Sequence, residues 1–325
     1  MGSYRGTGVA QEQPPDYAPI VDLHRPQDYV ADKGLVDAVN VAVILGMPLL
    51  VTGEPGTGKT ELAWSVAHEL GAGAPLVFPA KTTSTAQDLF YRYDALRHFR
   101  ESRFEETKGK PIEEYIEFEA LGIATLLSMP RDIADKRLPK PYRDIAPRRS
   151  VVLIDEIDKA PRDLPNDILR EIETMSFTVR ESRETFPTEG LTDPRFRPIV
   201  ILTSNSEKTL PNAFLRRCVY YHINPPEGVR LETIVKSRFR TAQVKLSDGQ
   251  IKSAVALFDE IRKIEGLRKK PATAELLMWM QLLLERRGDP AAARTDADAA
   301  DLAVSVLTKT DDDAKQVKAK LLRKP

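Results

Sequence analysis

A glycine-rich turn between an apolar segment and a helical pattern constrains the fold of this chain more than any other feature. Residues 48–60 read PLLVTGEPGTGKT, which ends in the pattern G-x-x-x-x-G-K-[ST]. Glycines let such a loop curl until several backbone N–H groups point at one phosphate chain, a turn that Cβ atoms would obstruct. Residues 61–70 carry apolar side chains at helical spacing, so the strand, loop and helix required by the pattern are all present. The sequence therefore predicts a phosphate site for a nucleotide.

The side chains of this loop have separate expected tasks. Lys59 is expected to reach the β- and γ-phosphates, and the Thr60 hydroxyl is expected to ligand Mg²⁺. The helix that begins there points its positive end at the same phosphates. The residues expected to contact nucleotide are Gly53, Glu54, Pro55, Gly56, Thr57, Gly58, Lys59, Thr60 and Glu61. A glycine-rich turn without a ligand is the alternative, and the flanking strand and helix argue against it.

Two carboxylates end a second apolar segment. Residues 151–154 are Val-Val-Leu-Ile, which is typical of a central parallel strand buried on both faces. Ligands of open α/β sheets lie at the carboxyl ends of strands, so Asp155 is expected beside the phosphate loop as an oxygen ligand for Mg²⁺. Glu156 is the candidate to orient and polarise the attacking water. A solvated turn is the alternative for this pattern alone, and Asp158 is expected to cap or pair with the following segment.

Two later segments add candidates for the same site. A strand expected at residues 198–203 leads to Asn205, which could hold the lytic water or a phosphate oxygen, or form a local Asx turn. Arg216 and Arg217 precede a strand expected at 219–223. An arginine pair in that position is usually a solvated helix end, but the order of the preceding segments makes it a catalytic candidate.

The order and spacing of the four segments resemble those of the AAA+ ATPases. Their amino-acid sequences are most similar to those of the MoxR branch. The resemblance extends over about residues 28–285. It rests on Asn40-Val41-Ala42 ahead of residues 48–56, Gln87-Asp88-Leu89 with Tyr91-Arg92-Tyr93-Asp94, Asp155-Glu156-Ile157-Asp158-Lys159-Ala160, and Thr203-Ser204-Asn205 through Leu215-Arg216-Arg217-Cys218.

The resemblance implies an ATP hydrolase that uses ATP and Mg²⁺ and remodels or activates partner proteins, much as a chaperone does. It implies Asn205 as a first sensor and Arg216 or Arg217 as a finger that acts on the ATP of a neighbouring copy. Such a finger requires a homo-oligomeric ring, commonly a hexamer. The partner implied for MoxR-like systems is a protein with a von Willebrand factor A domain.

The segment before one lid helix departs from the MoxR pattern. MoxR-like proteins often carry a sensor arginine directly after a proline, whereas Ala272 follows Pro271 here. Lys270 is the candidate to supply the charge from before the proline. A lysine lacks the planar fork of arginine, so the second sensor would be weaker or differently placed.

The fold expected from the resemblance is α/β, a three-layer αβα core with a five-stranded parallel sheet in the order 5-1-4-3-2, followed by an all-helical lid. The expected strands are 48–52, 76–79, 150–154, 198–203 and 219–223. Three domain ranges are expected: a flexible lead-in at 1–27, the nucleotide-binding core at 28–226 and the lid at 227–325.

Local patterns add further expectations. In the core they predict a helix at 29–44 and two inserts, one near 94–147 with helices at 112–129 and one at 177–197 forming a hairpin that turns near 184–190. Each insert is expected either to grip a substrate or to be passive surface. In the lid, Ser247 and Gln250 have the spacing of a capping box, and further helices are expected at 296–308 and 311–323.

Composition excludes several classes of protein. The 48 Lys and Arg balance the 48 Asp and Glu, so there is no global basic field of the kind that drives nonspecific nucleic-acid binding. Cys218 is the single cysteine and cannot form an internal disulfide. The first residues lack a signal-peptide pattern, and the apolar run at 41–51 is too short to cross a bilayer. A cytoplasmic location without membrane insertion is expected.

Two alternative functions stay open at this point. A nucleic-acid motor on the same fold would need a basic channel studded with aromatic side chains, which the neutral charge balance disfavours. A nucleotide-gated scaffold would bind ATP and barely hydrolyse it, which the Asp155-Glu156 pair disfavours. The motifs alone do not distinguish ATP from GTP, because the grip on the phosphates is shared.

Overall fold

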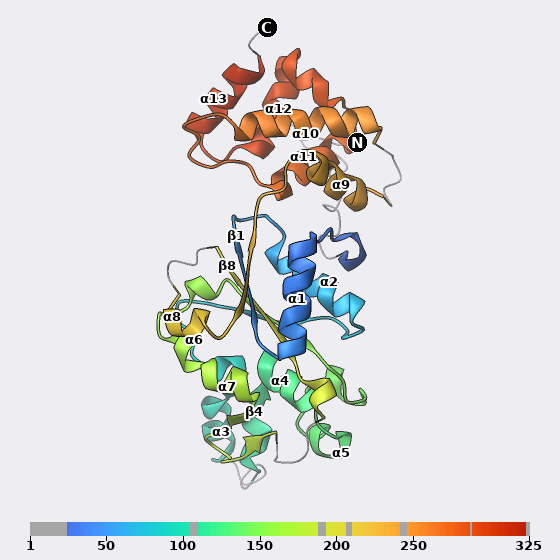
Figure 1. The fold of residues 1–325 in the computed structure, drawn as a ribbon. Helices are drawn as coiled ribbons and strands as arrows, with labels where there is room; N and C mark the ends of the chain where they lie inside the picture. The colour runs from blue at the N-terminus through green and yellow to red at the C-terminus, as the bar shows by residue number, and fades with distance from the viewer. Residues whose placement is uncertain are drawn as a thin grey trace, which may run out of the picture. The chain divides into compact units, whose positions relative to one another are not determined.

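The computed structural model describes residues 25–103, 110–187, 193–205, 210–240, 246–286 and 288–322. The chain divides into two compact units, one of which spans Pro26–Pro226. The other includes the chain from Glu227 onward. Figure 1 labels several elements of each unit.

The first unit is built on a five-stranded parallel sheet. Its strands lie in the order β9-β1-β8-β5-β2, which confirms the predicted order 5-1-4-3-2. The bounds are β1 (Leu49–Gly53), β2 (Leu76–Pro79), β5 (Val151–Asp155), β8 (Ile199–Ser204) and β9 (Val219–Ile223). β8 therefore lies between the strand that precedes the phosphate loop and the strand that ends in Asp155.

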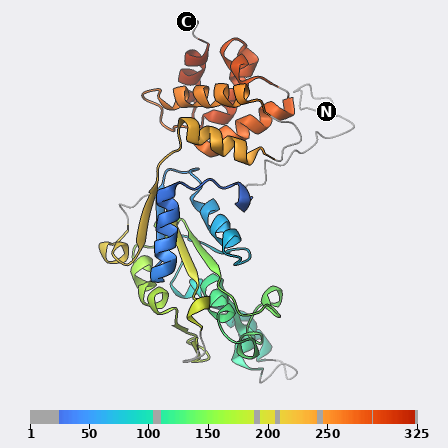
Figure 2. The same cartoon turned by 45° about the vertical axis from the view of Figure 1, so that its right-hand side comes forward.

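Helices cover both faces of this sheet. Alternate residues of β5 pack into different clusters, Val151 and Leu153 on one face and Val152 and Ile154 on the other. The first face is covered by α1 (Lys33–Leu45) and α2 (Lys59–Glu69), which run along the sheet in Figure 1 and Figure 2. The second is covered by helices that include α4 (Ala120–Leu127), α6 (Leu164–Asp167) and α7 (Leu169–Thr174). The three-layer prediction is confirmed.

The first helix is shorter than predicted. A 3₁₀ turn at Pro26–Asp28 precedes it, and α1 begins at Lys33, not at residue 29. The reason is Asp32, whose carboxylate accepts a hydrogen bond from the Leu35 N–H at 2.8 Å and so caps the helix. Gly46, with φ at 62°, ends it in the left-handed conformation.

The first insert contains a strand where a helix is predicted. Residues 112–129 fold as a 3₁₀ turn (Ile112–Tyr115), β4 (Ile116–Phe118) and α4. β4 pairs antiparallel with β3 (Tyr91–Tyr93), where the aromatic Tyr91 lies opposite Phe118 and Tyr93 lies opposite the β-branched Ile116. The other elements of this region are a 3₁₀ turn (Gln87–Leu89), α3 (Ala95–Glu101), α5 (Arg131–Ala134) and a 3₁₀ turn (Lys140–Tyr142).

The second insert is a hairpin, as predicted, but its turn lies earlier. β6 (Phe177–Thr178) pairs with β7 (Thr185–Phe186), and the Val179 N–H donates to the Glu184 carbonyl oxygen at 2.8 Å. The prediction of a turn near 184–190 is therefore wrong, although residues 188–190 lie outside the described residues. Phe177 and Phe186 oppose each other and are both buried, so their entry into the core determines where the chain reverses.

The remaining elements of the first unit connect these parts. A 3₁₀ turn (Ile157–Lys159) follows β5, a 3₁₀ turn (Pro194–Phe196) precedes β8, and α8 (Asn212–Leu215) precedes β9.

The second unit is helical over its described residues. Its elements are α9 (Gly228–Arg238), α10 (Asp248–Arg262), α11 (Thr273–Arg286), a 3₁₀ turn (Pro290–Arg294), α12 (Ala297–Leu307) and α13 (Asp311–Leu321). The predicted capping box is confirmed, with Ser247 and Gln250 bonded reciprocally at the start of α10. Trp279 and Phe258 lie in the centre of its core. Of the helices described, none is both long enough and apolar enough to cross a membrane.

Candidate nucleotide site

The backbone of the phosphate loop accepts only glycine at two points. A Cβ added at Gly53 would lie 2.6 Å from the Ile223 carbonyl oxygen, so a side chain would collide with the backbone of β9. Gly58 has φ at 86°, and a Cβ there would lie 3.3 Å from the ring of Tyr29. The loop thus curls between β1 and the first turn of α2, as phosphate binding requires.

The Lys59 side chain closes this loop on itself. Its Nζ donates to the carbonyl oxygens of Gly53 and Glu54, both at 2.9 Å. The residue is only 7% exposed, and this burial lowers the pKa of the Lys59 ammonium, while the negative charges of Asp158 and Asp155 act in the opposite direction. The ammonium group is therefore a partly desolvated cation at the mouth of the loop, where its attraction for a phosphate is strong.

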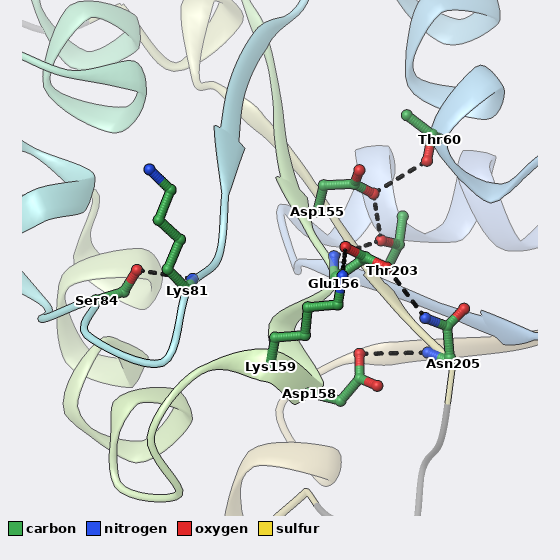
Figure 3. A network of polar contacts seen from close by, with 9 residues as sticks. All are labelled: Thr60, Lys81, Ser84, Asp155, Glu156, Asp158, Lys159, Thr203 and Asn205. Atoms are coloured by element: carbon green, nitrogen blue, oxygen red, sulfur yellow. Dashed lines mark hydrogen bonds and ion pairs between the residues drawn. The ribbon is translucent and has the colours of Figure 1, made fainter. Parts of the chain in front are cut away.

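Asp155 joins the loop to two strands of the sheet (Figure 3). The Thr60 hydroxyl donates to Asp155 Oδ1 at 3.0 Å, and the Thr203 hydroxyl donates to the same oxygen at 2.6 Å. Three segments far apart in the sequence, from α2, β5 and β8, therefore meet at one carboxylate.

The oxygen atoms at this point fit a Mg²⁺ ion. Neighbouring ligands in a Mg²⁺ octahedron, with bonds of about 2.1 Å, lie about 3 Å apart. Thr60 Oγ1 and Asp155 Oδ1 have that separation, at 3.0 Å. A hydroxyl and a carboxylate are also the hard oxygen donors that Mg²⁺ prefers. These two residues are the ones that would hold the ion, together with phosphate oxygens.

Glu156 is held in a specific orientation by its backbone and its side chain. It has a left-handed backbone, with φ at 54°, and its N–H donates to Thr203 Oγ1 at 2.8 Å. Its carboxylate accepts a hydrogen bond from Asn205 Nδ2 at 3.3 Å and forms an ion pair with Lys159. The hydrogen bond to Glu156 raises the pKa of Lys159. The structure thus brings the two predicted catalytic side chains, Glu156 and Asn205, into contact (Figure 3).

Asp158 has a different partner from the expected one. Its Oδ1 accepts a hydrogen bond from the Asn205 N–H at 3.3 Å, so it contacts the end of β8 and not the segment that follows it. The prediction of a local cap or ion pair is therefore wrong. The reason is the adjacency of β5 and β8, which brings the turn after β5 next to Asn205.

The arginine pair lies at the end of α8, and both side chains are exposed. Arg217 Nε forms an ion pair with Glu173 at 2.9 Å. Among the described residues the Arg216 side chain has no hydrogen-bond or ionic partner, and no such contact links either arginine to the phosphate loop. Phe214 of the same helix packs on the sheet face opposite α2.

Lys270 belongs to the second unit, where it is exposed ahead of α11. The segment leading to it is held by Asp313, which accepts hydrogen bonds from the N–H groups of Arg268 at 2.8 Å and Lys269 at 3.2 Å. Its task as a second sensor stays a prediction.

Comparison with known protein families adds to this geometry. Residues 48–218, more than half of the chain, match the family described as AAA domain (dynein-related subfamily). The chain belongs to this AAA family. The match begins just before the phosphate loop and ends at Cys218, directly after the arginine pair, so it includes every candidate residue of the first unit. Membership supports ATP binding and an ATP-driven activity.

The chain is also similar to solved structures. The FIGL-1 AAA domain in complex with ADP is 18% identical, with a TM-score of 0.43, and the match covers 92% of this chain and 87% of that one. A variant of Thermotoga maritima RuvB is 15% identical, with a TM-score of 0.43, and the match covers 89% of this chain and 67% of that one. No curated protein matches the chain.

Two residues of this AAA site are not predicted by the sequence. The sequence places Thr203 in an expected strand and in a segment that carries the family resemblance but predicts no task for it, yet its hydroxyl binds both Asp155 and the Glu156 backbone. Lys159 belongs to a segment that carries the family resemblance, but the sequence predicts no task for it, yet it pairs with Glu156. A polar side chain at the end of an otherwise apolar strand was the available signal for Thr203.

Proposed function

We propose that this chain is a Mg²⁺-dependent ATPase of the MoxR type that works as a homo-oligomeric ring and remodels or activates partner proteins. One observation carries the proposal. Thr60, Asp155, Glu156 and Asn205, from three separate segments, belong to one hydrogen-bonded group that is connected through Thr203 and lies directly beside the loop that Lys59 closes. This arrangement has the parts that phosphoryl transfer to water requires, which are a phosphate grip, a metal ligand pair and a candidate base.

Each residue has a proposed task. Lys59 and the N–H groups of the loop bind the β- and γ-phosphates, and Thr60 with Asp155 hold Mg²⁺, which neutralises charge on the phosphate oxygens when bound. Glu156 orients the attacking water and accepts its proton. Asn205 positions the Glu156 carboxylate and stays within reach of the same water. Thr203 fixes the positions of Asp155 and Glu156 relative to each other through its two hydrogen bonds.

Arg216 is the proposed finger that acts on the ATP of a neighbouring copy. Arg217 already pairs with Glu173 of its own chain, whereas the Arg216 side chain has no partner among the described residues. A finger must be available to a second subunit, so this difference favours Arg216. The proposal of a ring, commonly a hexamer, depends on this residue. Lys270 is retained as a second-sensor candidate.

The identity of the partner rests on resemblance alone. MoxR-like systems suggest a protein with a von Willebrand factor A domain, acting in the cytoplasm. The equal numbers of acidic and basic residues favour a protein partner over nucleic acid. ATP is proposed over GTP because of the family.

The test is ATP turnover and ATP binding for Glu156→Gln. The substitution keeps a hydrogen-bond acceptor for Asn205 but removes the base. We expect turnover to fall by about 10²–10⁴-fold, the usual contribution of general base catalysis, with the Kd for ATP changed little. Turnover equal to that of the native protein would contradict the assignment of Glu156. Glu173→Gln is a matched control, since that carboxylate pairs with Arg217 outside the phosphate site.

A further inference from the structure

A trough lies at the hairpin of the second insert, away from the phosphate site. Two cavities, of about 450 Å³ and about 610 Å³, are both lined by Ser176 and Thr185. The first extends toward β3 and α7, and the second extends toward α5 and the end of the hairpin. Ser176 directly precedes β6 and Thr185 lies in β7, so the two cavities adjoin at the hairpin. We call the two adjoining cavities the hairpin trough.

Aromatic rings form one wall of the first cavity. Phe90 and Phe177 are stacked with their ring centroids 4.7 Å apart, and Tyr91 lies beside Phe177 with a centroid distance of 6.4 Å. The Arg180 N–H donates to the Tyr91 hydroxyl at 2.9 Å, which ties β3 to the hairpin. This wall is rigid because its rings are buried and packed against one another.

Two arginines at the rim of the same cavity carry uncompensated charge. Arg170 and Arg180 both line it and both are exposed. Neither guanidinium group has a carboxylate partner in the part of the chain that the structure describes. A planar guanidinium without a partner is suited to bind a carboxylate through two hydrogen bonds.

We propose that the hairpin trough binds an extended segment of a client protein in which an acidic residue adjoins an aromatic or aliphatic one. The acidic side chain pairs with Arg170 and Arg180, and the apolar one packs on the aromatic wall. Nucleic acid fits less well, because the Glu171 carboxylate lines the first cavity and repels phosphates, whereas Glu184 in the second cavity is neutralised by its ion pair with Arg137. The inference rests on the proposed function only in taking the client to be a protein.

Fluorescence anisotropy of the full chain tests this with three probes. They are a fluorescein-labelled dodecapeptide that repeats Asp-Leu-Phe-Glu, the same peptide with Asn and Gln for the acids, and labelled dT₁₂. We expect the acidic peptide to bind at least about tenfold more tightly than its neutral counterpart, the difference expected for one or two charge-assisted hydrogen bonds. Tighter binding of dT₁₂ than of the acidic peptide, or no preference between the peptides, would overturn the proposal.

Charge-reversal variants locate the binding. The double variant Arg170→Glu with Arg180→Glu should lose at least about tenfold in affinity for the acidic peptide and should gain affinity for a peptide with Lys in place of the acids. Arg183→Glu is the matched control, because Arg183 is exposed on the same hairpin but lines neither cavity. An equal loss of affinity in the double variant and in Arg183→Glu would refute the assigned location.

ATP turnover separates this inference from the proposed function. Neither Arg170 nor Arg180 belongs to the phosphate site, so the double variant should hydrolyse ATP at the native basal rate without peptide. Native turnover with no peptide preference would reject the trough and leave the ATPase proposal intact. Preferential binding of the acidic peptide without ATP turnover would support the trough and reject the ATPase proposal.

Discussion

The hydroxyl of Thr60 donates a hydrogen bond to Asp155 Oδ1 at 3.0 Å, although the two residues are 95 positions apart in the sequence. The bond joins the first turn of α2 to the carboxyl end of β5. It therefore links the element that grips phosphate to the one that supplies acid groups, at a spacing that suits a shared Mg²⁺ ion.

Thr203 should be required for rapid turnover. Thr203→Val keeps the shape of the side chain but removes the hydrogen bonds to Asp155 and from the Glu156 N–H. Losing one charged and one neutral hydrogen bond should lower ATP turnover by about 10–100-fold. Steady-state turnover measures this. Thr203→Ser, which keeps the hydroxyl, should restore most of the rate, and a Ser variant as slow as the Val variant would show that the hydroxyl is not responsible.

The charge of Asp155 should determine the requirement for Mg²⁺. Asp155→Asn still offers an oxygen to the hydroxyls of Thr60 and Thr203, so the fold should persist with its Tm little changed. A neutral amide oxygen is a weaker Mg²⁺ ligand than a carboxylate. We expect the Mg²⁺ concentration for half-maximal turnover to rise about tenfold or more. An unchanged Mg²⁺ dependence would contradict the assignment of Asp155 as a ligand.

Arg197 should stabilise the first unit by holding the ends of two helices. Its guanidinium donates to the carbonyl oxygens of Gly46 at 3.1 Å, at the end of α1, and of Glu173 at 2.8 Å, in the last turn of α7. Helix C-termini attract cations, and these carbonyls would lose their donor in Arg197→Met. We expect the free energy of unfolding to fall by about 2–4 kcal/mol, measured by urea denaturation. Arg195→Met is the control. An equal loss in the free energy of unfolding for the two variants would contradict this interpretation.

Asp313 should make the second unit less stable in acid. Burial by itself would raise the pKa of Asp313, but hydrogen bonds from the Arg268 N–H and from Thr310 outweigh it and hold the pKa below its usual value. A lowered pKa in the folded state means that the stabilisation is present above the unfolded pKa and is lost as pH falls through the folded one.

The comparison of Asp313→Asn with the native chain tests this. We expect the variant to unfold at a lower temperature at pH 7, and the difference in Tm to shrink as the pH falls below the usual aspartate range. Differential scanning calorimetry across this range provides the measurement. A difference in Tm that stays constant with pH would mean that the charge of Asp313 plays no part.

The sequence is sufficient to predict the positions of residues that follow from the order of the strands. Lys59, Asp155 and Asn205 each follow an apolar strand, and the carboxyl ends of adjacent parallel strands meet at one edge. Thr203 was missed because its contact with Asp155 depends on the register of β5 and β8, in which Ile154 is opposite Leu202. Register is a property of the assembled sheet and cannot be read from either strand alone.

Tertiary packing explains the other errors. Residues 116–118 form a strand because β3 offers a pairing partner, which outweighs the helical pattern of the surrounding segment. The hairpin turns early because Phe177 and Phe186 pack opposite each other in the core. Asp158 reaches Asn205 because β8 is adjacent to β5. In each case the deciding partner is distant in the sequence.

The most direct test of the proposed ring ATPase is ATP turnover per subunit as a function of protein concentration, for the native chain, Arg216→Ala and Arg217→Ala. We predict a rate per subunit that rises with concentration in the native chain and falls by about 10³-fold or more in Arg216→Ala, as for an arginine finger. Arg217→Ala should retain most of the rate, because Arg217 pairs with Glu173 of its own chain. A rate that is independent of concentration and unchanged in both variants would mean that each subunit hydrolyses ATP alone, which would contradict the account.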